Sequence, residues 1–510
     1  MKFTMQWLAC LCLSLFMGLT VATAGQSSLA GAWAFVGENG PGSGLMMSRN
    51  GQRMMVALIT YDESGAGVWS VASGRLSESA AGAEDLFREP LQRVEGGACL
   101  ECPFEPGVLV DTQREIELRF ISQNQAWLTL DPAQPDAQAK LIRKLNVGQR
   151  AILSDPFPDL SGSWLFATQG VEPAQSLTAT LTRQPDRVIA GQRSIVYRSL
   201  ETFNETEIEI ECDVEVVQAE QRIGQCRLFD ANAIEMGIAA GADFDHQRII
   251  LPRVGDSGRW VGFRLERGQG EFGNLQSPFE GAWSFTDEQG PGSGLMLVRN
   301  GPRVMAVLTT YAQSGEPVWR IASGSLQFRE DQADAYFSAP LAAVTGGSCL
   351  DCPFEPGQIL PLSQQLEIRF DSATSGELSL QPDRGQQRFR IRKLNVGARL
   401  ALTDPLPELA GDWVYVMDFR GRFGFPFQVN QVLRSDITSA DGLRLLAFNS
   451  GLECLLDQTA ARDSIRSCAF WDTIPNPTAQ TPRGRGIDAD QMVLWSWSGN
   501  GLLHAFRLPR

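Results

Sequence analysis

The chain repeats itself across two halves, and this duplication constrains its fold more than any other feature. The string GPGSGLM, followed closely by RNG, begins at Gly40 and again at Gly290. GGACLECPFEPG at Gly96 corresponds to GGSCLDCPFEPG at Gly346, and IRKLNVG is also present in both halves. Matches of this length indicate that half of the chain was duplicated.

Each half also holds a second, more distant repeat. LAGAWAF at Leu29 is echoed by LSGSWLF at Leu160, and FEGAWSF at Phe279 by LAGDWVY at Leu409. A chain of 510 residues has room for three or four domains, so we expect two odd-type and two even-type units. The expected boundaries are 1–24 for a signal peptide, 25–149 and 279–398 for the odd units, and 160–267 and 409–510 for the even units.

The local patterns are those of β-strands. Residues 115–120 alternate strictly, with Ile116, Leu118 and Phe120 on one face, and residues 205–216 alternate over a longer span. No long segment shows helical periodicity with capping residues. The predicted class is therefore all-β, with tandem antiparallel units that are either barrel-like meanders or two-sheet sandwiches.

The N-terminal residues predict export. Lys2 is followed by an apolar stretch and then by Ala22-Thr23-Ala24, as in a secretory signal cleaved after Ala24. We expect a periplasmic or secreted protein with no membrane span after cleavage. The net charge of −15 makes nucleic acid an improbable partner, because an acidic surface repels phosphate.

Eight cysteines remain after the signal, an even number that favours disulfides in an exported chain. Cys99-x-x-Cys102 and Cys349-x-x-Cys352 allow three interpretations: a structural clip, a redox site or a four-cysteine metal site. Glycines before each motif and a proline directly after it do not suit the helix start that a reactive thiolate needs, which favours the clip. Two further pairs with equal spacing predict cross-strand disulfides, namely Cys212 with Cys226 and Cys454 with Cys468.

Two resemblances bear on the fold. A Gly-x-Trp motif on a first strand and an arginine on a last strand resemble the calycins, the lipocalin and avidin group, in which the two side chains pack at the closed end of a barrel. This resemblance implies four stacked pairs: Trp33 with Arg143, Trp164 with Arg264, Trp283 with Arg392, and Trp413 with Arg507. The Gly-x-Trp, SGxG, RNG and TYxxSGxPVW strings of the odd units resemble tandem modules in exported proteins of Gram-negative bacteria whose function is unassigned.

The glycine-rich string is not a phosphate loop. Pro41 and Pro291 remove an N–H donor, no lysine follows, and a strand comes next. In a calycin-like barrel the string would lie at the open mouth, where a ligand could meet Glu38, Ser43, Glu288 and Ser293. The alternative is a glycine-shaped corner without a ligand.

Aromatic residues flank the Ser-Gly turns that follow. Tyr61 with Trp69 and Tyr311 with Trp319 could form a sugar-stacking platform or pack across strands, and we favour packing.

Catalytic combinations are scarce. His246 and His504 occupy non-equivalent places, which argues against zinc sites and histidine-based triads, and we expect no metal or cofactor. Glu105 with Glu117 recurs as Glu355 with Glu367, the kind of pair that glycosidases use. We expect Glu117 to be a solvated residue on the polar face of its strand.

The sequence thus predicts an exported, non-enzymatic binding or structural protein whose odd units bind a small molecule, a glycan or a protein. The alternative is an extracytoplasmic thiol–disulfide redox protein that uses the two Cys-x-x-Cys segments.

Overall fold

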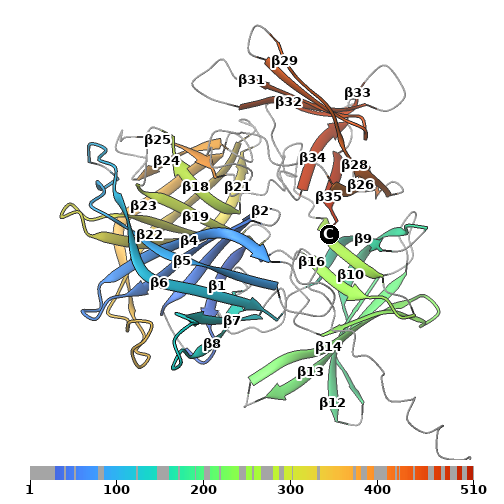
Figure 1. The fold of residues 1–510 in the computed structure, drawn as a ribbon. Coiled ribbons are helices and arrows are strands. Elements are labelled where there is room, and N and C mark those ends of the chain that lie inside the picture. The colour runs from blue at the N-terminus through green and yellow to red at the C-terminus, as the bar shows by residue number, and fades with distance from the viewer. Residues whose placement is uncertain are drawn as a thin grey trace, which may run out of the picture.

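The fold was described from a computed structural model of the chain (Figure 1). The described residues are 29–38, 42–50, 53–77, 85–100, 102–121, 125–145, 160–170, 173–189, 191–199, 207–217, 220–240, 248–255, 258–265, 280–286, 292–300, 303–329, 334–370, 375–380, 388–394, 411–419, 422–423, 426–439, 443–457, 464–471, 477–482, 491–496 and 502–508. All of their regular structure is β-strand, which confirms the predicted all-β class.

The first and third units are closed, eight-stranded antiparallel barrels in which each strand pairs with its neighbours in sequence and the last strand pairs with the first. The first barrel consists of β1 (Gly31–Phe35), β2 (Gly44–Asn50), β3 (Arg53–Tyr61), β4 (Gly67–Ser77), β5 (Asp85–Glu95), β6 (Val108–Phe120), β7 (Gln125–Leu130) and β8 (Ala139–Lys144). The third barrel consists of β18 (Gly281–Phe285), β19 (Gly294–Asn300), β20 (Arg303–Tyr311), β21 (Pro317–Arg329), β22 (Asp334–Thr345), β23 (Gln358–Phe370), β24 (Ser375–Leu380) and β25 (Arg388–Lys393).

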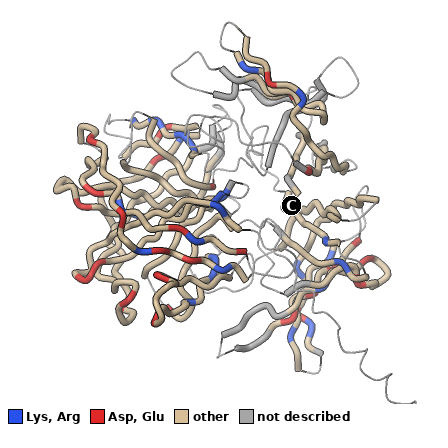
Figure 2. The backbone as a smooth tube through the Cα atoms, in the orientation of Figure 1, with Lys and Arg blue, Asp and Glu red and all other residues tan. Residues whose placement is uncertain are grey.

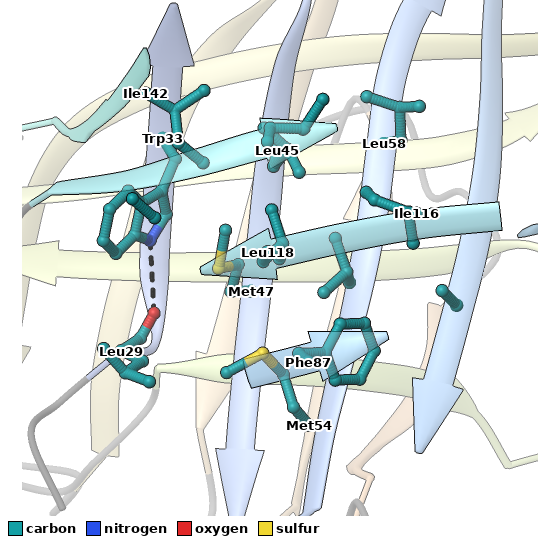
Figure 3. Packing of buried hydrophobic residues seen from close by; sticks show 14 of the residues in the cluster. Leu29, Trp33, Leu45, Met47, Met54, Leu58, Phe87, Ile116, Leu118 and Ile142 are labelled. Atoms are coloured by element: carbon teal, nitrogen blue, oxygen red, sulfur yellow. Dashed lines mark hydrogen bonds between the residues drawn. The ribbon is translucent and has the colours of Figure 1, made fainter. Parts of the chain in front are cut away.

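Side-chain alternation fills these barrels. In β6, Ile116, Leu118 and Phe120 point inward and are at most 1% exposed, as the sequence predicts. Trp33 enters the same core from β1, and its indole Nε1 donates to the carbonyl oxygen of Leu29 at 3.1 Å (Figure 3). Apolar side chains that are no more than 9% exposed form a cluster inside each odd barrel, so these interiors are filled largely by the chain's own side chains.

The second unit is a nearly closed barrel. Its strands are β9 (Gly162–Gln169), β10 (Ser176–Arg183), β11 (Arg187–Ile189), β12 (Gln192–Arg198), β13 (Ile208–Val217), β14 (Glu220–Asp230), β15 (Glu235–Ala240), β16 (Arg248–Pro252) and β17 (Arg259–Leu265). The sheet runs from β15 around to β16, and an isolated bridge between Gly237 and Arg253 joins these two ends.

The fourth unit closes through a bent segment. Its strands are β26 (Gly411–Phe419), β27 (Arg422–Phe423), β28 (Phe427–Gln431), β29 (Leu433–Thr438), β30 (Leu443–Phe448), β31 (Leu452–Asp457), β32 (Ser464–Trp471), β33 (Pro477–Pro482), β34 (Gln491–Ser496) and β35 (Leu502–Arg507). Only Val432 separates β28 from β29; β28 pairs with β26 and β29 pairs with β30, so one segment joins the two ends of the sheet. The units are thus closed or nearly closed barrels and not two-sheet sandwiches.

All four predicted disulfides are present: Cys99–Cys102, Cys212–Cys226, Cys349–Cys352 and Cys454–Cys468. Cys212 lies directly opposite Cys226 in the pairing of β13 with β14, with 4.0 Å between their Cα atoms. Cys454 and Cys468 have the same relation in β31 and β32.

The tryptophan–arginine pairing differs between the barrel types. In the second barrel the Arg264 guanidinium lies over the Trp164 ring at 5.7 Å, as the calycin resemblance implies. In the fourth barrel Trp413 is opposite Arg507 in strand register, but the Arg507 side chain lies outside the described residues.

In the odd barrels the expected pairs Trp33–Arg143 and Trp283–Arg392 are wrong by one position. Trp33 and Trp283 face Lys144 and Lys393, whereas the arginines face Ala34 and Ser284. Because side chains alternate along a strand, each arginine lies on the opposite face of the sheet from its tryptophan.

Candidate functional site

The first and third barrels lie side by side (Figure 1). Residues of β1, β2 and β3 form one buried cluster with residues of β18, β19 and β20. Ala32, Met46 and Ala57 of the first barrel share one buried cluster with Ala282, Met296 and Val307 of the third. These residues occupy equivalent positions of the repeat. Each half therefore uses the same patch of its surface to contact the other half. Such an isologous contact is the arrangement of a two-fold homodimer, here within one chain.

The four aromatic residues that we selected from the sequence lie inside this interface. The rings of Tyr61 and Trp319 are 6.0 Å apart, and those of Trp69 and Tyr311 are 6.3 Å apart, so each ring pairs with the opposite barrel. All four are at most 7% exposed. Burial raises the pKa of the Tyr61 hydroxyl to about 12. These side chains pack between barrels, and their predicted contact with a ligand stays a prediction.

Two extended hairpins carry the cysteine motifs across the interface. The first arm (residues 92–111) is the outer part of β5 and β6, and the second arm (residues 342–361) is the outer part of β22 and β23. Each arm begins where the strand register shifts, and a bulge of this kind bends a hairpin. The arms end in two loops that we call the first Cys loop (residues 96–107) and the second Cys loop (residues 346–357).

Glycines let the arms lie flat against the opposite barrel. A β-carbon added at Gly347 would lie 2.2 Å from Cε2 of Tyr61, and one added at Gly97 would lie equally close to Tyr311. The Gly346 N–H donates to the carbonyl oxygen of Gly65 at 3.0 Å, which fixes the second arm to the turn between β3 and β4. These double glycines are therefore part of the contact between the copies.

Each Cys loop inserts a leucine into the opposite barrel. Leu100 is 6% exposed and belongs to the core of the third barrel, and Leu350 is 8% exposed and belongs to the core of the first. A disulfide and a backbone hydrogen bond close a tight turn around each leucine. In the second Cys loop the Cys352 N–H donates to the carbonyl oxygen of Cys349 at 3.0 Å. The cysteines themselves are partly exposed. The clip interpretation is consistent with this geometry, because the clip holds the leucine at the tip of the loop.

The second Cys loop enters at the mouth of the first barrel, the end formed by Phe35, Gly42 and Lys140. Lys140 lies 5.7 Å from the centre of the Phe35 ring, and its Nζ donates to the carbonyl oxygen of Leu350. A β-carbon at Gly42 would lie 2.9 Å from Cε2 of Phe354, so the glycine-rich string makes room for this loop. The residues Gly40 and Pro41 of the string lie outside the described residues.

Charged groups surround this mouth. Arg114 donates through Nε to Asp131 and through Nη1 to Asp351 of the second Cys loop, each at 2.9 Å. Burial raises the pKa of Glu38, and the positive charge of Lys140 partly opposes this shift. Glu38 is thus a mouth residue, whereas Glu288 lies outside the described residues.

The two serines predicted for ligand binding are buried and bonded within their own barrels. The Ser43 and Thr60 hydroxyls are 2.7 Å apart, and those of Ser293 and Thr310 are 2.8 Å apart. Both serines are at most 8% exposed. Sequence reasoning missed the residues that do meet across the mouth, namely Leu350, Lys140 and Arg114. The sequence did contain a sign of this contact, because both Cys-x-x-Cys strings have a leucine after the first cysteine. Our interpretation of the two strings considered only their cysteines.

The prediction that Glu117 is solvated is wrong. The side chain of Glu117 is 4% exposed, and its carboxylate accepts a bond of 2.7 Å from Arg119, with Arg88 at 3.6 Å. Glu367, its counterpart, accepts from the Tyr336 hydroxyl at 2.9 Å and from Arg369 at 2.7 Å. Long neighbouring side chains cover these carboxylates on the outer face, which strand alternation alone does not reveal.

The even barrels also pair with each other. Phe263 of the second barrel stacks on Phe506 of the fourth, with 4.9 Å between ring centres, inside a shared apolar cluster. The Gln428 side chain donates to the carbonyl oxygens of Thr168 and Gln175, both at 3.1 Å. His504 lies on β35 and is 1% exposed, and burial lowers its pKa to about 4; His246 is outside the described residues.

Within the described residues, no group of three or more His, Cys, Asp or Glu residues is placed to hold a metal ion. The described part of the chain also has no helix long and apolar enough to cross a membrane. Acidic and basic residues are interspersed along the strands in the view of Figure 2.

Comparison with protein-family models found no family that matches the chain. Comparison with curated proteins also found no match.

Proposed function

We propose that this chain is an exported, non-enzymatic binding protein that binds at the mouths of its odd barrels and not inside them. The observation that carries the proposal is the reciprocal insertion of Leu100 and Leu350. Each mouth is built to receive a loop of polypeptide, and in the isolated chain each is filled by the other copy. The duplication thereby produces a protein in which the Cys loop of each odd barrel occupies the mouth of the other odd barrel.

The packed interiors support binding at the mouth. An eight-stranded barrel has room either for its own side chains or for one small ligand. In the first barrel, apolar side chains that are at most 9% exposed form the core, so the chain's own side chains take that room. A ligand therefore has to meet the chain at a rim or on an outer surface.

Export is supported by the cysteines. Four disulfides are compatible with an oxidising compartment, and they hold together a chain whose first residues resemble a secretory signal. We propose the periplasm or the external medium as its location. N-terminal sequencing of the exported protein tests this, and a chain that retains residues 1–24 contradicts it.

Removing both leucines tests whether the mouths are held closed by the loops. In the mature chain, L100A/L350A should increase amide hydrogen exchange in the loops and in the opposite mouths, because the apolar anchor is lost. The barrel cores should stay protected. The matched control is L109A/L360A, which removes leucines that lie on the same arms but are 48% and 45% exposed. Equal exchange in both variants would contradict the proposal.

A thiol–disulfide redox protein is the second candidate, favoured by one observation. The Cys99–Cys102 and Cys349–Cys352 pairs are partly exposed, whereas Cys212, Cys226, Cys454 and Cys468 are at most 1% exposed. In a glutathione series we expect the two loop disulfides to be reduced before the buried pairs, because a thiolate can reach them. Turnover of a disulfide substrate would favour this candidate over binding; simple reduction without turnover would not.

A further inference from the structure

We propose that the mouth of the first barrel is a recognition site for a disulfide-closed turn in which leucine is followed by an acidic residue. The turn that it fits is the second Cys loop, supplied by this chain or by a second copy of it. This inference rests on the proposed function and names the ligand of the same site.

Three contacts recognise three features of the turn. The apolar interior takes the Leu350 side chain, Lys140 Nζ donates to the Leu350 carbonyl oxygen, and Arg114 Nη1 donates to Oδ2 of Asp351 at 2.9 Å. The site thus distinguishes an apolar side chain, a backbone carbonyl and a carboxylate in sequence order. A contact made for packing alone would need only the first of these.

The arginine is fixed in place by its own barrel. Its Nε donates to Oδ2 of Asp131 at 2.9 Å, while the other Asp131 oxygen accepts the Glu115 N–H at 2.9 Å. Asp131 therefore holds Arg114 in position through bonds that do not involve the loop. A guanidinium oriented in this way loses little freedom when it binds a carboxylate.

The third barrel provides an internal comparison. Gln364 stands where the first barrel has Arg114, and it accepts a bond from Arg320 at 2.8 Å. Phe389 stands where the first barrel has Lys140, and its ring packs on Phe285 at 5.8 Å. The third mouth keeps the apolar position for Leu100 but lacks the equivalents of Lys140 and Arg114. The cation beside Gln364 is Arg320 of β21. The pair of cations that meets Leu350 and Asp351 therefore belongs to the first mouth.

The tethered loop competes with any loop added from outside, because it is present at high effective concentration. The test therefore uses the mature chain with L350A, which leaves the loop in place but removes its anchor. The probe is a synthetic, disulfide-closed peptide with the sequence of residues 346–357, and binding is measured by titration calorimetry. We expect saturable binding to L350A, at least tenfold tighter than to the unaltered chain.

Peptide variants test which features are recognised. Replacing Asp351 of the peptide by Asn should weaken binding to L350A, and replacing Leu350 by Ala should abolish it. In the L350A/R114Q chain, which copies the third barrel, the Asp and Asn peptides should bind equally. The matched control is L100A, which empties only the third mouth and should show no preference for Asp. Equal affinity of the two peptides for L350A would overturn the proposal.

A double-mutant cycle keeps the inference testable if L350A does not fold. In the full chain with its loop intact, D351N should raise amide exchange at residues 131–140, but it should add little to a chain that carries R114Q, because that chain has already lost the bond to Asp351. Additive effects would overturn the inference. If L100A/L350A frees the mouths but the peptide does not bind, the inference fails and the proposed function stands. If the mouths stay closed in that variant, the proposed function itself fails.

Discussion

At the scale of single residues, buried polar atoms mark the surfaces where barrels meet. The Tyr61 hydroxyl, the Trp319 Nε1 and the His504 Nδ1 are buried without a hydrogen-bond partner among the described residues. Tyr61 and Trp319 lie between the odd barrels. Because such atoms cost free energy in an apolar setting, they show that ring packing determines these positions more than polarity does.

His504 should make the fourth barrel sensitive to acid. Its pKa falls from an ordinary 6.5 to about 4 because burial disfavours the charged ring. Between these values the unfolded chain binds a proton that the folded chain excludes, so stability decreases as the pH falls from 6.5 to 4. The loss should total about 3 kcal/mol, since one pKa unit corresponds to roughly 1.4 kcal/mol.

The matched variant is H504V, because Val261 occupies the equivalent position in the second barrel. Denaturant unfolding at pH 7 and at pH 4 should show a smaller loss of stability for H504V than for the unaltered chain. Equal losses would mean that His504 does not titrate within a buried environment.

At the scale of elements, the arms depend on glycines that accept the opposite ring. Gly347 meets Cε2 of Tyr61, and no positive φ is recorded for it, so an alanine there would be excluded by contact alone. G347A should destabilise the chain by about 1 to 3 kcal/mol, the usual cost of overpacking. In chains that carry Y61A, adding G347A should cost little, because the ring that it meets is gone. An undiminished cost, measured by denaturant unfolding, would show that the glycine is needed for another reason.

At the scale of the whole molecule, each half associates with the other twice, through odd barrels and through even barrels. The stacked Phe263 and Phe506 rings stand at the second of these interfaces. F263A and F506A should each cost about 3 to 5 kcal/mol, as for other buried phenylalanines. Their combination should cost less than the sum, because both remove one shared contact. Additive losses in denaturant unfolding would argue against pairing of the even barrels.

The sequence by itself determined the features that depend on local pattern and spacing. Strict alternation placed Ile116, Leu118 and Phe120 in a core, and equal cysteine spacing predicted both Cys212–Cys226 and Cys454–Cys468. The duplication predicted the number of units. These features follow from the two-residue period of a strand and from opposite positions in a hairpin, which the chain encodes over short distances.

Only the tertiary structure decided how the copies use each other. A repeat seen in sequence does not reveal whether its copies touch, so Leu350 could not be placed in the first barrel from its motif. One register position separated Trp33 from the expected Arg143, and the closure of a barrel fixes that register. In the sequence, the glycine-rich strings and the Cys loops were candidates for two separate functional sites. The fold brings Gly42 and Phe354 together because contacts between distant segments are determined by packing of whole barrels and not by local pattern.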